Sequence, residues 1–93
     1  MSKMVQEILK IVNERGLHAR AAAKFTVLAE QFESEITVSN GRESVNGRSI
    51  MGLLLLGAAK GTKVTVCAEG KDASSAMSAI IELVADGFGE DKA

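Results

Sequence analysis

The 93-residue sequence predicts an α+β fold, in which three helices cover one face of a four-stranded antiparallel sheet. Two kinds of periodicity favour this class. Four segments carry apolar residues at alternating positions, as half-buried strands do, and three segments carry them at helical spacing. The segments follow one another as strand, helix, strand, strand, helix, strand and helix. Elements with one apolar face each suit two layers, with the far face of the sheet left to solvent.

The first strand is expected at 4–12 and the first helix at 21–32. The inward face of this strand is expected to comprise Val5, Leu9 and Ile11. This choice places Glu7 awkwardly among apolar neighbours. The helix is expected because apolar side chains recur at helical spacing, at Ala22, Phe25, Leu28, Ala29 and Phe32.

A hairpin is expected next. Residues 34–39 alternate, with Ile36 and Val38 on one face. Asn40-Gly41 follows and predicts a two-residue turn, because these residue types tolerate the positive φ that such turns require. The return strand is then expected at 42–46.

The remaining elements are a helix, a strand and a helix. The second helix is expected to begin after Ser49, a good cap, and to end at Lys60-Gly61. Residues 62–69 alternate as a strand does, and Asp72 is expected to cap the third helix. Residues 89–93 are expected to fray. The buried stripe of the third helix is expected to comprise Met77, Ile80, Ile81, Val84 and Phe88.

Composition excludes several classes of function. A net charge of −1 without a basic stripe argues against nucleic acid, and three phenylalanines with no tyrosine or tryptophan argue against base stacking on a sheet. No signal peptide is visible, and the apolar run at 53–56 is far too short to span a bilayer. The single cysteine, Cys67, fits a reducing cytosol. We expect one cytoplasmic domain over 1–93, without membrane insertion, metal or cofactor.

His18, the only histidine, lies where the first strand gives way to the first helix. The first amides of a helix have no partner within it, and with the helix dipole they favour an anion. The dipole should also favour the neutral, nucleophilic imidazole. Arg20 adds a guanidinium fork that suits phosphate oxygens. The alternatives are a structural or exposed histidine and a solvated arginine.

The second helix carries more apolar residues than one buried stripe can hold. Leu53 and Leu56 have the spacing of a buried side. Met51, Leu54 and Leu55 should then be at least partly exposed. An exposed apolar cluster on a soluble protein is typical of a docking surface. The alternatives are a helix that is covered all round and a homodimer contact.

Two motifs carry a resemblance to a known family. The first is Gly-Leu-His-Ala-Arg at 16–20 with Ala-Ala-Lys-Phe at 22–25. The second is Val-Asn-Gly-Arg-Ser-Ile-Met-Gly-Leu-Leu at 45–54 with Ala-Ala-Lys-Gly at 58–61. In this order and spacing they resemble HPr, the histidine-containing phosphocarrier of the bacterial phosphoenolpyruvate-dependent phosphotransferase system. The resemblance covers nearly the whole chain and implies an open-faced β-sandwich with the same order of elements.

The resemblance implies a phosphoryl carrier rather than a free-standing catalyst. His18 matches the histidine that is phosphorylated on Nδ1 by phospho-enzyme I and then passes the group to an enzyme IIA protein. Arg20 matches the partner of the phosphoryl group. Ser49 matches the regulatory site of a serine kinase and phosphorylase, and a phosphate there should weaken docking through its added negative charge. The residues expected to dock both enzymes are Ala23, Lys24, Met51, Leu54 and Leu55, on a monomeric carrier.

Two positions depart from the family pattern. Ala21 stands where proline is usual, but it keeps its N–H, so the start of the helix should survive. Arg15 stands where a small polar residue is usual. It is either a second cation near the phosphoryl group or a solvated residue, and we favour the solvated residue. Ala21 resembles versions of the protein in regulatory, often nitrogen-related, phosphotransferase chains. Two alternatives to sugar transport therefore stay open, a carrier in such a chain and a regulatory binding module that acts through Ser49 and the second helix.

Overall fold

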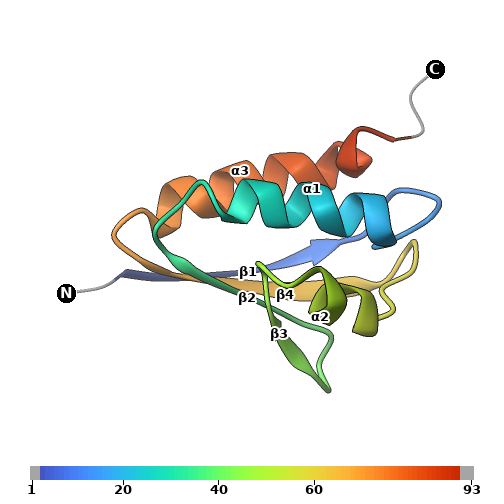
Figure 1. The fold of residues 1–93 in the computed structure, drawn as a ribbon, viewed down its shortest axis with the longest axis horizontal. Helices are drawn as coiled ribbons and strands as arrows, with labels where there is room; N and C mark the ends of the chain where they lie inside the picture. The colour runs from blue at the N-terminus through green and yellow to red at the C-terminus, as the bar shows by residue number, and fades with distance from the viewer. Residues whose placement is uncertain (1–2, 91–93) are drawn as a thin grey trace.

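Strands of alternating burial build one antiparallel sheet, and helices cover one of its faces (Figure 1). The computed structural model describes residues 3–90. Its strands are β1 (Lys3–Lys10), β2 (Glu35–Ser39), β3 (Ser44–Asn46) and β4 (Lys63–Gly70), and its helices are α1 (Ala19–Ala29), α2 (Ile50–Leu55), α3 (Ala73–Ala85) and a short 3-10 helix, η1 (Gly87–Gly89). The strands lie in the order β1-β4-β2-β3. The predicted class and the two layers are confirmed.

The alternation predicted for the last strand is confirmed in β4, which pairs with β1 on one side and β2 on the other. Val64, Val66 and Ala68 are buried, whereas Lys63 and Glu69 are exposed. A shift of one residue in the pairing would expose the whole buried set. The alternation of β4 therefore fixes the register of both of its neighbours.

The position of β1 at the edge of the sheet explains Glu7. Val5 and Leu9 are half-buried, and Ile11, just beyond the strand, is fully buried. Glu7 shares the face of Val5 and Leu9, yet it is exposed. An edge strand leaves room for a carboxylate to reach water, and such charges discourage pairing with another chain.

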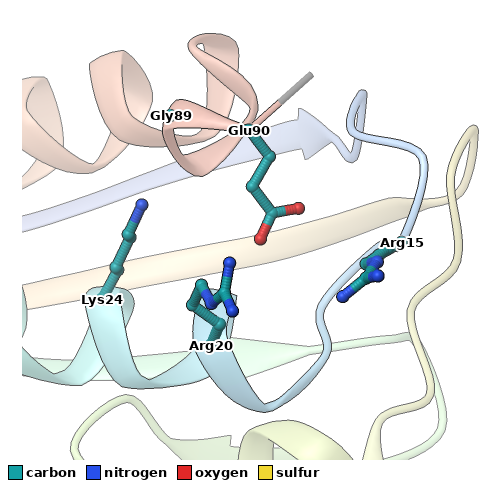
Figure 2. Close-up of a pocket in the computed structure, with 5 residues that line it drawn as sticks. All are labelled: Arg15, Arg20, Lys24, Gly89 and Glu90. Carbon is teal, nitrogen blue, oxygen red and sulfur yellow. The ribbon is translucent and has the colours of Figure 1, made fainter. Parts of the chain in front are cut away.

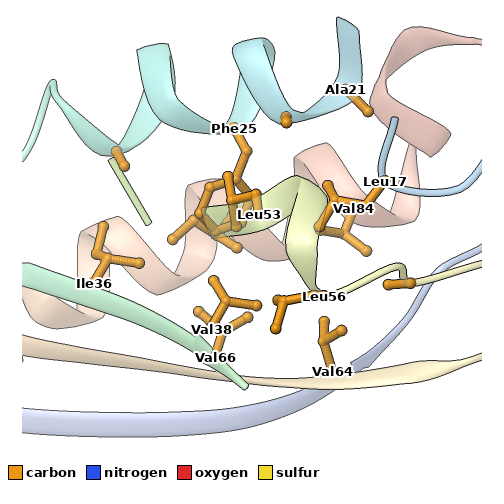
Figure 3. Close-up of a cluster of buried hydrophobic side chains, with 14 of the residues drawn as sticks. Leu17, Ala21, Phe25, Ile36, Val38, Leu53, Leu56, Val64, Val66 and Val84 are labelled. Carbon is orange, nitrogen blue, oxygen red and sulfur yellow. The ribbon is translucent and has the colours of Figure 1, made fainter. Parts of the chain in front are cut away.

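The core joins α1, α2 and the sheet (Figure 3). Phe25 of α1 and Leu53 of α2 are both buried between the helices and the sheet, above Val38 and Val66. Burial of a phenylalanine or leucine side chain contributes about 1.5–3 kcal/mol. Ala21 is also buried, and α1 begins before it, so the alanine in place of the usual proline leaves the start of the helix intact.

The first helix is shifted relative to the prediction. It begins at Ala19 and ends at Ala29 instead of near Phe32. Beyond its end, the Arg48 guanidinium donates hydrogen bonds to the carbonyls of Ala29 at 3.4 Å, Phe32 at 2.5 Å and Ser34 at 3.3 Å. A cation at a helix C-terminus is favoured by the helix dipole. Arg48 thus joins the segment before α2 to the end of α1.

The predicted end of the second helix is wrong. The helix was expected to reach Lys60-Gly61, but α2 ends at Leu55, with Leu56 as its C-cap. Gly57 follows with a φ of +59°. Glycine adopts this left-handed conformation readily and ends many helices in this way. The chain therefore stops the helix at the earlier of its two glycines.

The predicted two-residue turn between β2 and β3 is also wrong. Ser39 pairs with Ser44, so residues 40–43 form the connection. The Asn40 side-chain oxygen accepts hydrogen bonds from the amides of Arg42 at 2.9 Å and Glu43 at 2.8 Å. Because the Asn40 side chain satisfies these amides, they are not available to extend the pairing of the strands.

The C-terminal elements follow the prediction in part. Met77, Ile80 and Val84 are buried as predicted. Ile81 is 37% exposed, because it lies one position past Ile80 and hence about 100° round the helix. Phe88 is buried, but it belongs to η1 and has a φ of +57°.

Asp72 precedes α3 as predicted, but its carboxylate makes no capping hydrogen bond there. It instead accepts hydrogen bonds from the Ser34 amide at 2.9 Å, the Ser34 hydroxyl at 2.5 Å and the Glu33 amide at 2.9 Å. The bond from the Ser34 hydroxyl, followed by that from the Glu33 amide, lowers the pKa of the Asp72 carboxyl below its usual 3.8. The ionised carboxylate joins the loop after α1 to the start of α3.

The predicted fraying of 89–93 is wrong for the two residues that the structure describes. Gly89 belongs to η1, and Glu90 makes two side-chain hydrogen bonds. Residues 91–93 lie outside the described part of the chain. Among residues 3–90, no helix has the length and apolar character needed to cross a membrane.

Candidate functional site

His18 is placed by the close approach of two backbone segments. Gly16 has a φ of +66°, which glycine adopts without strain. The Leu17 amide donates a hydrogen bond of 2.9 Å to the Ala58 carbonyl. A Cβ on Gly16 would lie 2.4 Å from that carbonyl oxygen. Only glycine therefore lets the loop before α1 lie so close to the segment after α2.

His18 is the N-cap residue of α1. Its backbone is extended, and its carbonyl accepts the Ala22 amide at 2.8 Å. The amides of residues 19–21 precede this first helical bond, so they open toward the N-terminal end of the helix. The imidazole makes no capping bond, and its side chain is 23% exposed. It is therefore available for chemistry beside the positive end of the helix.

Glu90 contacts the imidazole, and sequence reasoning missed this residue. One carboxylate oxygen accepts a hydrogen bond from His18 Nε2, and the Glu90 side chain is only 12% exposed. The other oxygen accepts a bond of 2.9 Å from the side-chain amide of buried Asn13. That same amide also donates to the Gly16 carbonyl at 2.8 Å. The loop before α1 and the C-terminal segment thus hold one another at the histidine.

Glu90 is held in its ionised form. Desolvation acts to raise the pKa of its carboxyl, but the hydrogen bonds from Asn13 and His18 and the charge of Lys24 outweigh desolvation. The pKa of Glu90 consequently lies below its usual 4.5. The carboxylate is therefore an acceptor, not a donor, in its bond to His18 at neutral pH.

Three cationic side chains and this carboxylate line a pocket of about 310 Å³. Figure 2 shows Arg20 and Glu90 pointing toward one another, while Arg15 faces them from the loop before α1. Arg15 is exposed, as expected of a solvated residue, yet it also lines this pocket. Because the positive side chains outnumber the carboxylate, the pocket suits an anion.

Lys24 connects α1 to the C-terminal segment. Its ammonium donates a hydrogen bond of 2.7 Å to the Phe88 carbonyl. Phe88 is buried, so this carbonyl is firmly placed. Lys24 is predicted to be a docking residue. In the structure it lines the pocket and also binds the C-terminal segment through the Phe88 carbonyl.

The predicted docking residues of α2 are exposed. Met51 and Leu55 are each 71% exposed, Leu54 is half-buried, and Leu53 is fully buried, as the spacing predicted. Ser49 caps the helix, since its hydroxyl accepts the Gly52 amide at 3.0 Å. The cap is confirmed, whereas docking and serine phosphorylation stay predictions.

An apolar groove runs along the other side of α1. Val27, Leu28 and Leu83 line it, together with the predicted docking residue Ala23. Helix α1 contacts both α2 and α3, so it lies between this groove and the exposed residues of α2. Arg20 in the first turn of α1 borders this groove.

This geometry suits a covalent phosphoryl intermediate. An imidazole nitrogen can serve as the nucleophile, and a helix end with neighbouring cations can stabilise the charge of a phosphoryl group. The family described as "PTS HPr component phosphorylation site" matches residues 5–86. The chain belongs to the HPr family. It is accordingly a phosphocarrier protein of the phosphotransferase system.

Relatives of this HPr-family chain match it over almost its full length. Phosphocarrier protein HPr of Neisseria meningitidis is 47% identical over 87 residues, which cover 94% of this chain and 98% of that protein. Phosphocarrier protein NPr of Shewanella violacea is 40% identical and covers 97% of this chain and 98% of its own length. The crystal structure of HPr-C-His from Thermoanaerobacter tengcongensis has a TM-score of 0.90 and 40% identity, over 95% of this chain and 99% of that one.

The sequence did contain a signal for the missed carboxylate. Gly87 and Gly89 flank an apolar residue directly after the last predicted helix, a pattern that indicates a sharp turn. Such a turn can bring the next residue, Glu90, back over the fold. No local pattern shows which helix it then reaches.

We predict that Gly16→Ala destabilises the fold and displaces His18, whereas Gly57→Ala has a much smaller effect. The two glycines have similar φ values, +66° and +59°, but a Cβ at Gly57 meets nothing within 4 Å. The difference isolates the clash with Ala58, which should cost about 1–3 kcal/mol. Urea unfolding of both variants measures this difference. Equal losses of stability would show that the close approach at Ala58 does not constrain the loop.

Proposed function

We propose that His18 accepts a phosphoryl group on Nδ1 from phospho-enzyme I and passes it to a histidine of an enzyme IIA protein. The observation that carries the proposal is the partly exposed imidazole at the N-cap of α1, beside a pocket lined by Arg15, Arg20 and Lys24. In-line transfer between two nucleophiles depends mainly on positioning and on stabilising charge. A helix N-terminus and a guanidinium fork supply both.

Arg20 is proposed to hold the phosphoryl oxygens. Its side chain is exposed in the first turn of α1, where the helix dipole does not favour a cation. A basic residue that gains nothing from its own helix is free to bind an external anion. Its planar fork matches two phosphoryl oxygens at once.

The exposed residues of α2 are proposed to dock both partner enzymes. Met51 and Leu55 present apolar surface on the helix next to the one that carries His18. Ala23 and Lys24 line the groove on the other side of α1 and are proposed as a second part of the docking surface. A partner seated there would have its own histidine brought to the first turn of α1.

A regulatory role is the second candidate. The match to phosphocarrier protein NPr of Shewanella violacea, which covers almost the whole chain, supports this candidate, because NPr is named separately from HPr. Ser49 is half-buried at the start of the docking helix, so a kinase that modifies it would add negative charge at the edge of an apolar surface. We propose that a serine kinase and phosphorylase could act there in a nitrogen-related or other regulatory chain. A cytoplasmic location and a monomeric state are part of the same proposal.

Incubation with phosphoenolpyruvate and enzyme I is expected to give one acid-labile, alkali-stable phosphoryl group per chain. The expected label is lost in His18→Ala, because His18 is the only histidine of the sequence. Radiolabel from phosphoenolpyruvate, followed through acid and alkali treatment, measures both properties. Wild-type labelling of His18→Ala would overturn the carrier role of this residue.

Leu55→Ser is expected to raise the KM of enzyme I for this carrier about tenfold, or about 1.4 kcal/mol of binding, with kcat little changed. Ile8→Ser is the matched control, because Ile8 is similarly exposed, at 64%, but lies on β1 instead of α2. Steady-state phosphorylation at varied carrier concentration separates the two constants. An equal rise in KM for both variants would show that enzyme I does not dock on the exposed residues of α2.

A bacterial HPr serine kinase with ATP is expected to add an acid-stable label at Ser49. Ser49→Asn is the sharper variant, since asparagine also caps helices well but has no hydroxyl to modify. The wild type should take up the label and Ser49→Asn should not, as judged by mass spectrometry. Absence of label on the wild type would remove the serine switch and leave the carrier function untouched.

A further inference from the structure

We infer that Glu90 is a positioning residue for phosphoryl transfer, whose carboxylate keeps the imidazole hydrogen on Nε2 and so presents the Nδ1 lone pair to the phosphoryl group. This inference rests on the proposed function of His18. It assigns a role to the C-terminal segment, which the two sequence motifs do not include. The observation behind the inference is the hydrogen bond between His18 and Glu90, which lie 72 residues apart in the sequence.

The Glu90 carboxylate is fixed from both of its oxygens. One accepts from His18 Nε2, and the other accepts from Asn13, which is buried. A carboxylate with two anchored oxygens cannot turn away from the ring without breaking a bond. The carboxylate therefore fixes both the orientation of the imidazole ring and the nitrogen that carries its hydrogen.

The segment that carries Glu90 is itself built to return to α1. Phe88 is buried although its φ is +57°, a left-handed conformation that residues other than glycine rarely adopt. Gly87 and Gly89 on either side also have positive φ values. The Lys24 ammonium then holds the Phe88 carbonyl at 2.7 Å. Burial and this tether maintain a turn that places the next side chain at His18. Figure 2 shows the Glu90 side chain extending from this turn toward Arg20 of α1.

The retained hydrogen matters in both directions of transfer. When His18 accepts the group, the Nδ1 lone pair forms the N–P bond while the bond from phosphorus to the donor breaks, and its electron pair leaves with the donor. The ring then carries a positive charge beside the Glu90 carboxylate. When His18 gives up the group, the N–P electron pair returns to Nδ1, and the ring leaves as neutral imidazole because Nε2 has kept its hydrogen. A ring without that hydrogen would leave as an anion.

Two other roles of Glu90 make different predictions. A carboxylate that only fastens the C-terminal segment would affect stability and leave the ring unchanged. A carboxylate that competes with the phosphoryl group for the cationic pocket would slow phosphorylation, so its removal would accelerate the reaction. Positioning predicts slower transfer and a changed tautomer in addition to any loss of stability from the broken bond to Asn13.

The tautomer is measured by ¹⁵N NMR of the free protein, in which the single histidine makes the imidazole signals unambiguous. The variants are Glu90→Ala and Glu90→Gln, whose amide can accept from or donate to the ring. Glu30→Gln is the matched control, because Glu30 is exposed at the far end of α1. We expect His18 to carry hydrogen on Nε2 in the wild type and in the control, and a second tautomer to become detectable in both Glu90 variants.

The rate is measured with phosphoramidate, a small phosphoryl donor that needs no partner protein, and followed by ³¹P NMR. Removal of a carboxylate that orients a metal-binding histidine typically costs about 10–100-fold, and by analogy we expect phosphorylation and the later loss of the group to slow roughly tenfold in both Glu90 variants. Thermal unfolding of each variant provides the check on folding.

Unchanged tautomers, or phosphorylation that becomes faster without Glu90, would overturn the inference. Neither measurement uses enzyme I, so a failure here is distinct from a failure of the proposed function. Conversely, wild-type protein that reacts with phosphoramidate but not with phospho-enzyme I would contradict the partner assignment and leave the role of Glu90 standing.

Discussion

The structure depends on the close contact between Gly16-Leu17 and Ala58. The Leu17 amide binds the Ala58 carbonyl at 2.9 Å, and only a glycine at position 16 leaves room for that oxygen. This contact brings the loop that carries His18 against the segment that follows α2. His18 and the proposed docking surface are thereby joined through backbone, which is less easily displaced than side chains on a surface.

A second constraint makes the two nitrogens of His18 different. Nε2 faces the Glu90 carboxylate, while the residue itself caps α1 and leaves the first helical amides open. One side of the ring therefore meets a negative charge, and the surroundings of the pocket are mainly positive. An imidazole in symmetric surroundings would accept a phosphoryl group at either nitrogen. Here the fold distinguishes between them with groups from both ends of the chain.

The sequence predicted what depends on local pattern. The alternation of β4, the cap at Ser49 and the exposure of Met51 follow from residue type and spacing, and each is confirmed. The end of α2 was missed because two glycines follow the helix and only the backbone shows that Gly57 takes the left-handed conformation. Glu90 was missed for a different reason. Its partner lies 72 residues away, and no periodicity encodes a contact of that range.

The most direct test of the role of His18 is the ¹⁵N–³¹P coupling in ¹⁵N-labelled protein phosphorylated by phosphoenolpyruvate and enzyme I. We predict a one-bond coupling to Nδ1 of His18, with hydrogen still present on Nε2. A coupling to Nε2 would require the bond to Glu90 to break and would contradict the assignment of the two nitrogens. A phosphoryl group on any other residue would contradict the role of His18 itself.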